Sequence, residues 1–437
     1  MQFLRHAAPV APAAAGIEHV MASDNFVIVG GGLAGATAAK TLRAEGYGGP
    51  VILLAEEGHH PYLRPPLSKE FLLGKAEDDA LPVVPAGWYA QNGVELRLGA
   101  AVTRIDPAAR SVTLRDGQSL GYASLLLATG ARPRRLPLPG SGAEGVSTFR
   151  TVDDCRRLRA GLADGGRNVV MIGSGWIGME LAAAACAYGN SVTLLGLEEV
   201  PLGAAIGPEL GGFFRSLHEA NGVRFRLPAS AAEIREQSGR VTGVVTDAGE
   251  ILPADLVIIA VGVAPEVSLA EAAGIALQNG ILTDASLRTS APGIFAAGDV
   301  ANALHPFTGE HHRSEHWSNA LNGGKVAARA MLGQDAVLDT VPYFYTDQFD
   351  VSMEYSGFPA LVAGPPAIRG SIEGKEFLAF WQRDGRVVAG MSVNWPRSGK
   401  PQKMIKQLIA ARTAVSPADL TDPGVPLDSL LPESQLY

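Results

Sequence analysis

The amino-acid sequence predicts an α/β fold with two Rossmann-like dinucleotide-binding domains and a C-terminal α+β domain. Two strand-turn-helix units carry the glycine spacing G-x-G-x-x-G, one at Phe26–Gly35 and one at Asn168–Glu180. In each unit an apolar run of strand type precedes the glycines, and an alanine-rich stretch of helical type follows them. This context is that of a dinucleotide-binding turn, so two turns predict two bound dinucleotides.

The first turn contains the three glycines that a dinucleotide site requires. Gly30 permits the tight turn, Gly32 lets the backbone approach a pyrophosphate, and Gly35 lets the helix pack closely on the strand. The helix N-terminus then presents unpaired N–H groups to the phosphates. The next strand, Val51–Ala55, is followed by Glu56, whose carboxylate we expect to accept hydrogen bonds from ribose hydroxyls. The predicted contacts are Gly30, Gly32, Leu33, Ala34, Gly35 and Glu56.

The second turn repeats this arrangement but departs from it at one position. The following strand, Ser191–Leu195, should end in an acidic residue that binds a ribose of the nicotinamide dinucleotide. Gly196 stands there instead. Glu198 and Glu199 follow shortly and are the alternative ribose ligands. No Arg or Lys lies there to neutralise a 2′-phosphate, so NADH is favoured and NADPH stays open. The other predicted contacts of this turn are Gly173, Gly175, Trp176, Ile177, Gly178 and Glu180.

Composition and charge exclude several classes of protein. The 437 residues are 47% hydrophobic and 18% charged, which is typical of a globular protein of about three domains. The net charge of -8 argues against nucleic acid or an anionic membrane as the main partner. No apolar run is long enough to span a membrane, and no metal site is expected.

The N-terminal segment and the cysteines bear on processing and location. Residues 1–22 are rich in Ala and Pro and are expected to form a flexible leader, with Met21 as an alternative start. The two cysteines, Cys155 and Cys186, form no disulfide framework, which favours a reducing cytoplasm.

A more specific pattern follows the first strand-turn-helix unit. The string PYLRPPLSK, at Pro61–Lys69, resembles the flavin-binding segment of NADH-dependent ferredoxin and rubredoxin reductases of oxygenase systems. These reductases are related to apoptosis-inducing factor, and the resemblance runs from about Asp24 to nearly the C-terminus. It implies that the first turn binds FAD and that the second binds NAD(H).

The resemblance also implies a charged pair beside the flavin. In that family the residue at Lys69 lies beside flavin N5 and pairs with the glutamate after the second turn, here Glu180. A buried ammonium near N5 favours electron-rich reduced flavin, and the carboxylate offsets the desolvation cost of the ammonium. Arg64 is implied to contact the flavin phosphate or the ribityl chain, and Pro65 belongs to the same flavin-binding segment. His59 and His60 are expected to be polar loop residues.

The resemblance implies further flavin contacts along the chain. The buried strand of Leu125–Pro133 and the segment Thr289–Val300 both return to the flavin, and Asp299 hydrogen-bonds the ribityl chain at a helix N-terminus. Arg132 lies either at the flavin phosphate or in solvent beside other arginines. The implied contacts are Val102, Ala128, Thr129, Gly130, Arg132, Gly298 and Asp299.

Aromatic residues are expected around the flavin ring. By resemblance, His316 and Trp317 lie close to the ring, with Trp317 on the face where nicotinamide or outgoing electrons pass; ordinary core packing is its alternative role. In the C-terminal domain Phe344 or Tyr345 covers the flavin, at places where tryptophans are usual. Gly262, near the end of a second buried strand, is implied to contact the nicotinamide dinucleotide.

The expected domain limits follow from these motifs. The FAD-binding domain comprises residues 23–143 and 265–338 and is split by the NAD-binding domain at 144–264. The C-terminal domain at 339–437 should contain strands near 368–372, 377–382 and 387–393 and a last helix at 402–412. The exposed basic residues of that helix, Lys403, Lys406 and Arg412, either dock an acidic ferredoxin or form a solvated face.

The segment at Pro65–Ser68 bears on the chemistry. Disulfide reductases of this fold carry a cysteine pair there, whereas this chain has Pro-Pro-Leu-Ser, which argues against thiol chemistry. The resemblance implies instead transfer of electrons from NADH through FAD to a [2Fe-2S] ferredoxin or rubredoxin that serves an oxygenase. Lys69, Glu180 and Trp317 are expected to carry the reaction, in a monomer or a homodimer. An NADH-sensing flavoprotein and a reductase acting directly on a small molecule are the alternatives.

Overall fold

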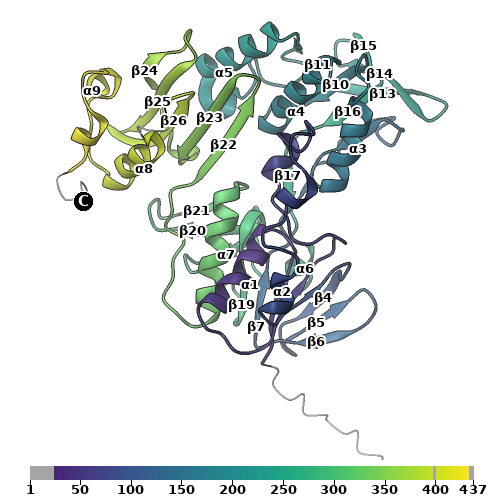
Figure 1. Cartoon of the computed structure of the whole chain (residues 1–437), viewed down its shortest axis with the longest axis vertical. Coiled ribbons are helices and arrows are strands. Elements are labelled where there is room, and N and C mark those ends of the chain that lie inside the picture. The colour runs from purple at the N-terminus through teal and green to yellow at the C-terminus, as the bar shows by residue number, and fades with distance from the viewer. Residues whose placement is uncertain (1–23, 397–399, 433–437) are drawn as a thin grey trace, which may run out of the picture.

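The first turn follows the central strand of a parallel five-stranded sheet. In the computed structural model (Figure 1), which describes residues 24–396 and 400–432, the strand order of this sheet is β19-β7-β1-β2-β3. The apolar runs form strands because both faces of the sheet are covered and nearly every strand side chain is buried. The strands are β1 (Phe26–Val29), β2 (Val51–Leu54), β3 (Val94–Arg97), β7 (Ser124–Leu127) and β19 (Ile294–Ala296).

Small residues let two helices pack tightly on one face of this sheet. α1 (Leu33–Ala44) lies against α7 (Trp317–Met331), and a Cβ added at Gly324 would lie only 2.5 Å from the carbonyl oxygen of Ala34. The opposite face is covered by the antiparallel sheet of β4 (Val102–Asp106), β5 (Ser111–Leu114) and β6 (Ser119–Gly121). We call this unit the first-turn domain.

The second turn follows the central strand of a second parallel five-stranded sheet. We call the unit built on this sheet the second-turn domain. The strand order is β12-β11-β10-β16-β9, and the paired strands are parallel. The strands are β9 (Val146–Thr148), β10 (Asn168–Ile172), β11 (Ser191–Leu195), β12 (Arg224–Arg226) and β16 (Leu256–Ile259). The helices are α3 (Val152–Leu162), α4 (Trp176–Ala187) and α5 (Gly203–Ala220). A short antiparallel pair, β8 (Ala131–Pro133) and β17 (Val263–Pro265), marks where the chain leaves the first-turn domain and returns.

The C-terminal domain is an antiparallel sheet with helices at one side. The strand order is β22-β23-β26-β25-β24. The strands are β22 (Tyr343–Gln348), β23 (Val351–Gly357), β24 (Ala367–Ser371), β25 (Glu376–Arg383) and β26 (Arg386–Val393), followed by α8 (Pro401–Ala411). The three predicted strands and the helix at 402–412 are confirmed, but α9 (Pro417–Thr421) follows, so the prediction that α8 is the last helix was wrong.

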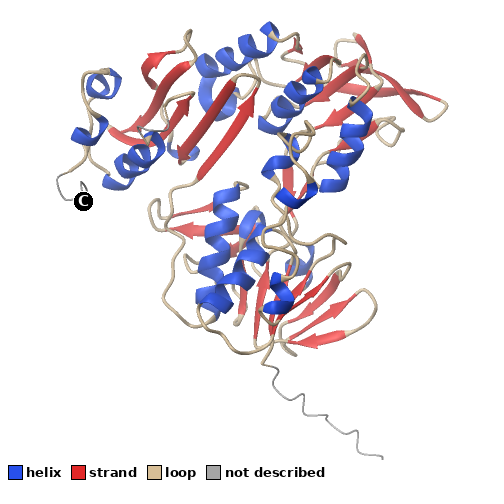
Figure 2. Cartoon of the chain, in the orientation of Figure 1, coloured by secondary structure: helices blue, strands red, loops and turns tan. Residues whose placement is uncertain are grey.

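The C-terminal sheet packs on the helices of the second-turn domain. Figures 1 and 2 show α5 between the two sheets. Phe214 of α5 is fully buried, and the neighbouring Phe213 meets Phe377 of β25 edge to face at 5.4 Å between ring centroids. Aromatic contacts of this kind add to the burial of apolar surface. One continuous hydrophobic core therefore joins these two domains.

The remaining elements are short. They are β13 (Ala231–Gln237), β14 (Arg240–Thr246), β15 (Ile251–Pro253), β18 (Ile281–Thr283), β20 (Ala301–His305), β21 (Glu310–Arg313), α2 (Trp88–Gln91), α6 (Ser268–Ala272) and the 3₁₀ helices η1 (Pro65–Ser68), η2 (Asp78–Ala80), η3 (Gly298–Val300), η4 (Pro359–Leu361) and η6 (Leu427–Leu430). Because every sheet except the β8–β17 pair lies within one predicted unit, we propose the domain limits 23–143 with 265–338, 144–264 and 339–437.

Two further sequence predictions concern the N-terminal leader and membrane-spanning segments. The leader at residues 1–22 lies outside the described residues. Among residues 24–396 and 400–432, no helix has both the length and the apolar character needed to cross a bilayer.

A buried histidine lies where α5 meets the C-terminal sheet. His218 is fully buried, and its Nε2 lies 2.8 Å from the amide oxygen of Gln348 on β22. Because an amide oxygen only accepts, Nε2 carries the proton and donates it. Burial lowers the pKa of His218 to about 4, so the imidazole is neutral in the folded protein at neutral pH.

Because His218 is buried in its neutral form, we expect the protein to lose stability in mild acid. The unfolded chain protonates His218 near pH 6.5 and the folded chain only near 4, so its contribution is full above pH 6.5 and falls as the pH drops towards 4. His218→Gln keeps a donor for Gln348 but does not titrate. Between pH 7 and 5 the free energy of unfolding of the wild type should fall by about 2 kcal/mol more than that of the variant, measured by denaturant titration. Equal losses would contradict the buried neutral state.

Candidate functional site

The two glycine turns have the same backbone geometry. Gly30 has φ of +123° and Gly173 has φ of +118°, a region that side chains rarely adopt. A Cβ at Gly30 would overlap the carbonyl oxygen of Ala128, and one at Gly173 would overlap that of Ala260. Each turn therefore presses against the next strand of its sheet and tolerates only glycine at its first position.

The middle of each turn is open. A Cβ added at Gly32 or at Gly175 would meet no protein atom within 4 Å. These two residues also cap α1 and α4 without a side-chain hydrogen bond to the helix N–H groups. Open space in front of unpaired helix N–H groups fits a pyrophosphate, so the residues present suit two dinucleotides.

A buried ion pair joins the first-turn domain to α4. Lys69 Nζ lies 2.8 Å from Glu180 Oε1, and the two side chains are only 7% and 3% exposed. The hydroxyl of Ser68 donates to Glu180 Oε2. The predicted pair of Lys69 and Glu180 is therefore present.

The C-terminal domain provides a further hydrogen bond to the carboxylate of Glu180. Thr346 of β22 donates its hydroxyl to Glu180 Oε1 at 2.5 Å, and Gln348 Nε2 donates to Thr346 Oγ1 at 3.1 Å. Gln348 in turn binds His218, so a chain of buried hydrogen bonds runs from the ion pair to α5. Satisfied networks of this kind hold a buried charge in one position.

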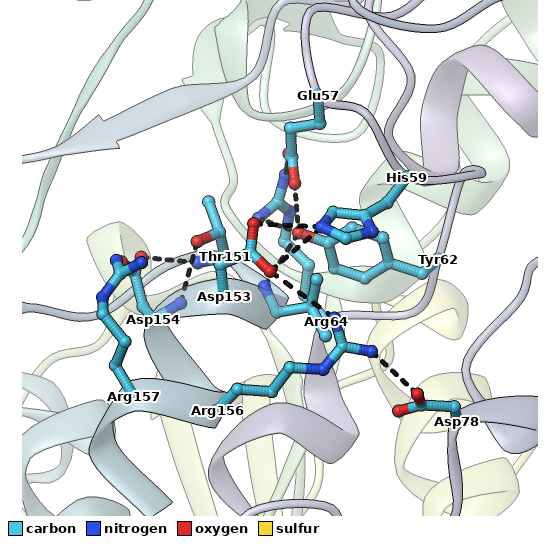
Figure 3. A network of polar contacts seen from close by, with 11 residues as sticks. Glu57, His59, Tyr62, Arg64, Asp78, Thr151, Asp153, Asp154, Arg156 and Arg157 are labelled. Carbon is cyan, nitrogen blue, oxygen red and sulfur yellow. Dashed lines mark hydrogen bonds and ion pairs between the residues drawn. The ribbon is translucent and has the colours of Figure 1, made fainter. Parts of the chain in front are cut away.

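A polar network holds the loop after β2 to the start of α3 (Figure 3). Arg64 pairs with Glu57 at 2.8 Å and donates to the carbonyl oxygen of Arg150 at 2.6 Å. Tyr62 donates its hydroxyl to Glu57 at 2.6 Å. The two Arg64 donors at Nη1 and Nη2 thus bind protein acceptors.

The same network pairs residues that are distant in sequence. His59 lies 3.0 Å from Asp153, and Arg156 lies 2.9 Å from Asp78. His59 is a polar loop residue, as expected, and its acidic partner comes 94 residues later in the chain. These contacts hold the start of α3 against the chain on both sides of the segment Pro61–Lys69.

Asp299 lies where the chain returns to the first-turn domain. It stands in η3 and not at the start of α7, and its carboxylate accepts a hydrogen bond from Arg150 at 2.6 Å. Gly298, just before it, has φ of +78°. Arg64 binds the backbone of Arg150, and the side chain of Arg150 binds Asp299, so the three residues form a continuous chain.

Aromatic rings gather between α7 and β22. Phe344 stacks on His316 at 4.4 Å and meets Trp176 of α4 at 5.1 Å between ring centroids. The ring of Tyr345 lies 5.2 Å from Lys69 Nζ, which is cation–π distance. Burial lowers the pKa of His316 to about 4, while Trp317 is the half-buried first residue of α7. All three domains contribute to this group.

The outer residues predicted for the two sites are more exposed. Glu56 pairs with Arg115 at 3.2 Å and Arg132 at 3.5 Å, and Arg132 also pairs with Glu266. Arg132 is thus an exposed ion-pair partner in this structure. The half-buried Val102 begins β4, Thr129 donates its hydroxyl to the backbone of Glu266, and Gly130 has φ of +72°.

The second site differs from the prediction at its acidic residues. Gly196 is buried, and Glu198 accepts a hydrogen bond from the amide of Ala204 at the start of α5 at 3.1 Å. Ile177 is exposed beside the turn, and Gly262 is exposed with φ of +87°. The carboxylate predicted to bind a ribose therefore caps a helix.

The basic residues predicted on α8 are not all exposed. Lys406 is half-buried over the ring of Tyr343 at 4.2 Å, and burial lowers its pKa. Arg412 lies 4.1 Å from the ring of Phe307, and Lys403 is exposed. The prediction of three exposed cations was wrong for Lys406, because its stem packs within the domain.

The cysteine thiols are poorly suited to redox chemistry. Burial raises the pKa of Cys155 to about 12 and that of Cys186 to about 11, so both thiols stay protonated at neutral pH. Among the described residues, no cluster of three His, Cys, Asp or Glu side chains could hold a metal ion.

Comparison with known proteins places this geometry in a family. The family described as pyridine nucleotide-disulphide oxidoreductase matches residues 24–324, and the reductase C-terminal family matches residues 343–431. The chain belongs to the pyridine nucleotide-disulphide oxidoreductases. It is therefore an oxidoreductase, and its cofactors are FAD and NAD(H).

Several relatives of this oxidoreductase are similar over their whole length. The ferredoxin–NAD(+) reductase component of the anthranilate 1,2-dioxygenase system of Burkholderia cepacia is 38% identical and covers 94% of this chain and 100% of its own. A probable ferredoxin reductase of Castellaniella defragrans is 36% identical and covers 94% and 99%. The crystal structure of a ferredoxin reductase from Rhodopseudomonas palustris superposes with a TM-score of 0.90 at 34% identity, covering 94% and 100%.

Sequence reasoning missed several residues of this oxidoreductase site. Ser68, Thr346, Gln348, His218 and Arg150 were not predicted, although Ser68 lies inside the string PYLRPPLSK and Thr346 directly follows Tyr345. β22 carried one usable signal, since its three aromatic residues are followed by three polar ones, of which Thr346 and Gln348 are buried. His218 and Arg150 carried none, because only the folded chain brings them near their partners.

Thr346 offers a test of the buried network. Thr346→Val keeps the shape but removes the hydroxyl that donates to Glu180, so the free energy of unfolding of the holoprotein should fall by about 1–3 kcal/mol. Thr346→Ser keeps the hydroxyl and should retain most of that stability. Denaturant titration measures both, and equal losses in the two variants would show that the methyl group matters and the hydrogen bond does not.

Proposed function

We propose that this chain is an FAD-dependent reductase that carries electrons from NADH to a [2Fe-2S] ferredoxin or rubredoxin that serves an oxygenase. The observation that supports this most is the buried pair of Lys69 and Glu180, held by groups from all three domains. The names of relatives add support, since they include ferredoxin reductases, a rubredoxin reductase from Pseudomonas putida and a putidaredoxin reductase in complex with putidaredoxin.

The two sites have different tasks in this proposal. The first turn, with Gly30, Gly32, Leu33, Ala34, Gly35, Glu56, Pro65, Val102, Ala128, Thr129, Gly130, Arg132, Gly298 and Asp299, holds FAD, and Arg64 supports this site through Arg150. The second turn, with Gly173, Gly175, Trp176, Ile177, Gly178 and Gly262, holds NAD(H). FAD, when bound, would accept a hydride and pass its two electrons on one at a time.

Lys69 places a fixed positive charge beside the flavin. Glu180 pairs with the ammonium at 2.8 Å although both side chains are almost fully buried, and Ser68 and Thr346 fix the carboxylate. A positive charge at this point stabilises the negative charge that arrives with the electrons. Arg64 acts on the flavin site indirectly, by holding Arg150 against Asp299.

Aromatic side chains complete the cover of the site. Tyr345 lies over Lys69, and Phe344 stacks on His316, so the C-terminal domain encloses the region where hydride and electrons pass. Trp317 follows His316 directly, as the first residue of α7. Because the described thiols stay protonated, electrons leave through an external acceptor and not through a protein disulfide. The protein works in the cytoplasm as a monomer or a homodimer.

Direct electron transfer to a ferredoxin tests this function. Purified holoprotein, NADH and a [2Fe-2S] ferredoxin are mixed with cytochrome c, whose reduction is followed spectrophotometrically. We expect reduction that depends on both NADH and ferredoxin. Flavin reduction by NADH without transfer to ferredoxin or rubredoxin would support a small-molecule reductase, and very slow flavin reduction with a lasting long-wavelength band would support a sensor.

Lys69 can be tested with a matched control. Lys69→Met preserves the length of the side chain but removes its charge, so flavin bleaching by saturating NADH should slow at least about tenfold while FAD stays bound, since the charge acts mainly during electron arrival. Lys75→Met makes the same change at an exposed lysine nearby and should leave the rate unchanged. An unaltered rate in Lys69→Met would contradict the role of the pair.

A further inference from the structure

The side chain of Ser174 fills the space where the strand-end acid of a nicotinamide site would begin. Ser174 lies between Gly173 and Gly175 in the second turn and is only 7% exposed. A Cβ added at Gly196 would overlap the hydroxyl of Ser174 and lie 2.8 Å from its Cβ and 2.9 Å from Leu227 Cδ2. The absence of a side chain at residue 196 thus follows from the presence of one at residue 174.

The backbone at Gly196 cannot move away to relieve such an overlap. Its N–H lies 3.4 Å from the carbonyl oxygen of Arg226, and its carbonyl oxygen accepts a hydrogen bond from Ala229 at 2.7 Å. Ser174 is fixed as well, because its carbonyl oxygen accepts from the amide of Leu202 at 3.1 Å at the start of α5. Leu227 can change rotamer, but the Cβ of Ser174 cannot be displaced without moving the turn itself.

The nearby charges do not replace the missing carboxylate. Glu198 accepts a hydrogen bond from the amide of Ala204, and Glu199 is exposed. Arg226 is held by Glu250 through contacts of 2.8 and 2.9 Å, so it is not presented to a phosphate. The side chain that occupies the place of the strand-end acid is therefore a neutral hydroxyl, which can donate or accept but neither repels nor attracts a 2′-phosphate by charge.

We propose that Ser174 is the specificity-determining residue of the second site and that it makes this site nearly indifferent to the 2′-phosphate, so that NAD(H) and NADP(H) bind with similar affinity. This deepens the proposed function, since it rests on the second turn being the nicotinamide site. A carboxylate at residue 196 would select the 2′-hydroxyl and reject the phosphate. Gly196 cannot be changed to supply it unless Ser174 is changed too.

Binding of NAD⁺ and NADP⁺ to the oxidised holoprotein, measured by isothermal titration calorimetry, tests this proposal. The wild type should bind the two nucleotides with Kd values within about tenfold of each other, because no charged group distinguishes them. Ser174→Gly/Gly196→Glu should favour NAD⁺ by at least about tenfold more than the wild type, which is the range of a charge-assisted hydrogen bond. Ser174→Gly/Gly196→Gln has the same size without the charge and should not gain this preference.

The single variant gives the decisive contrast. Gly196→Glu alone should lower the melting temperature and weaken binding of both nucleotides, because Ser174 occupies the space. Tighter NAD⁺ binding by Gly196→Glu with an unchanged melting temperature would overturn the proposal. So would a wild-type preference above about a hundredfold, or a preference that Glu198→Gln alone removes.

This experiment separates the two proposals. The titrations contain no ferredoxin and need no turnover, so failure of the ferredoxin proposal would leave their outcome intact. Absence of any nucleotide binding by the wild type would instead contradict the assignment of the second turn, and with it both proposals.

Discussion

One buried ion pair lies where groups from the three domains meet. Lys69 comes from the first-turn domain and Glu180 from α4, and both are almost fully removed from water. Leaving either charge without its partner would cost about 3–5 kcal/mol, so the pair is stable only with its full set of hydrogen bonds. Ser68 and Thr346 provide that set, and Thr346 belongs to the C-terminal domain. The chemistry therefore requires the domains to be packed as they are.

This requirement gives the C-terminal domain a role beyond covering the site. Its strand β22 presents Phe344 towards His316, Tyr345 towards Lys69 and Thr346 towards the carboxylate of Glu180. Gln348 donates to Thr346 and so supports that contact. The core that it shares with α5 fixes the strand from behind. A rigid strand holds such groups more accurately than a loop, which matters where small displacements change rates of electron and hydride transfer.

The sequence predicted the parts of the site that local patterns encode. The glycine turns, Lys69 and Glu180 were found because each lies at a fixed offset in a motif. Asp153 as the partner of His59 and Thr346 as a further partner of Glu180 could not be found, because they meet these residues only after long separations in the chain. Gly196 was recognised as a departure, but its cause was hidden, since Ser174 is 22 residues earlier and meets it only through the pairing of β10 with β11.

The coupling between Lys69 and Glu180 during flavin reduction tests this account most directly. The rate constant for flavin bleaching after anaerobic mixing with saturating NADH is measured for the wild type, Lys69→Met, Glu180→Gln and the double variant. If the two residues act as one unit, the double variant should react within about twofold of Lys69→Met, since Glu180 then has no charge left to position. A double variant slowed by the product of the two single effects would mean that the residues act independently, and would contradict the account.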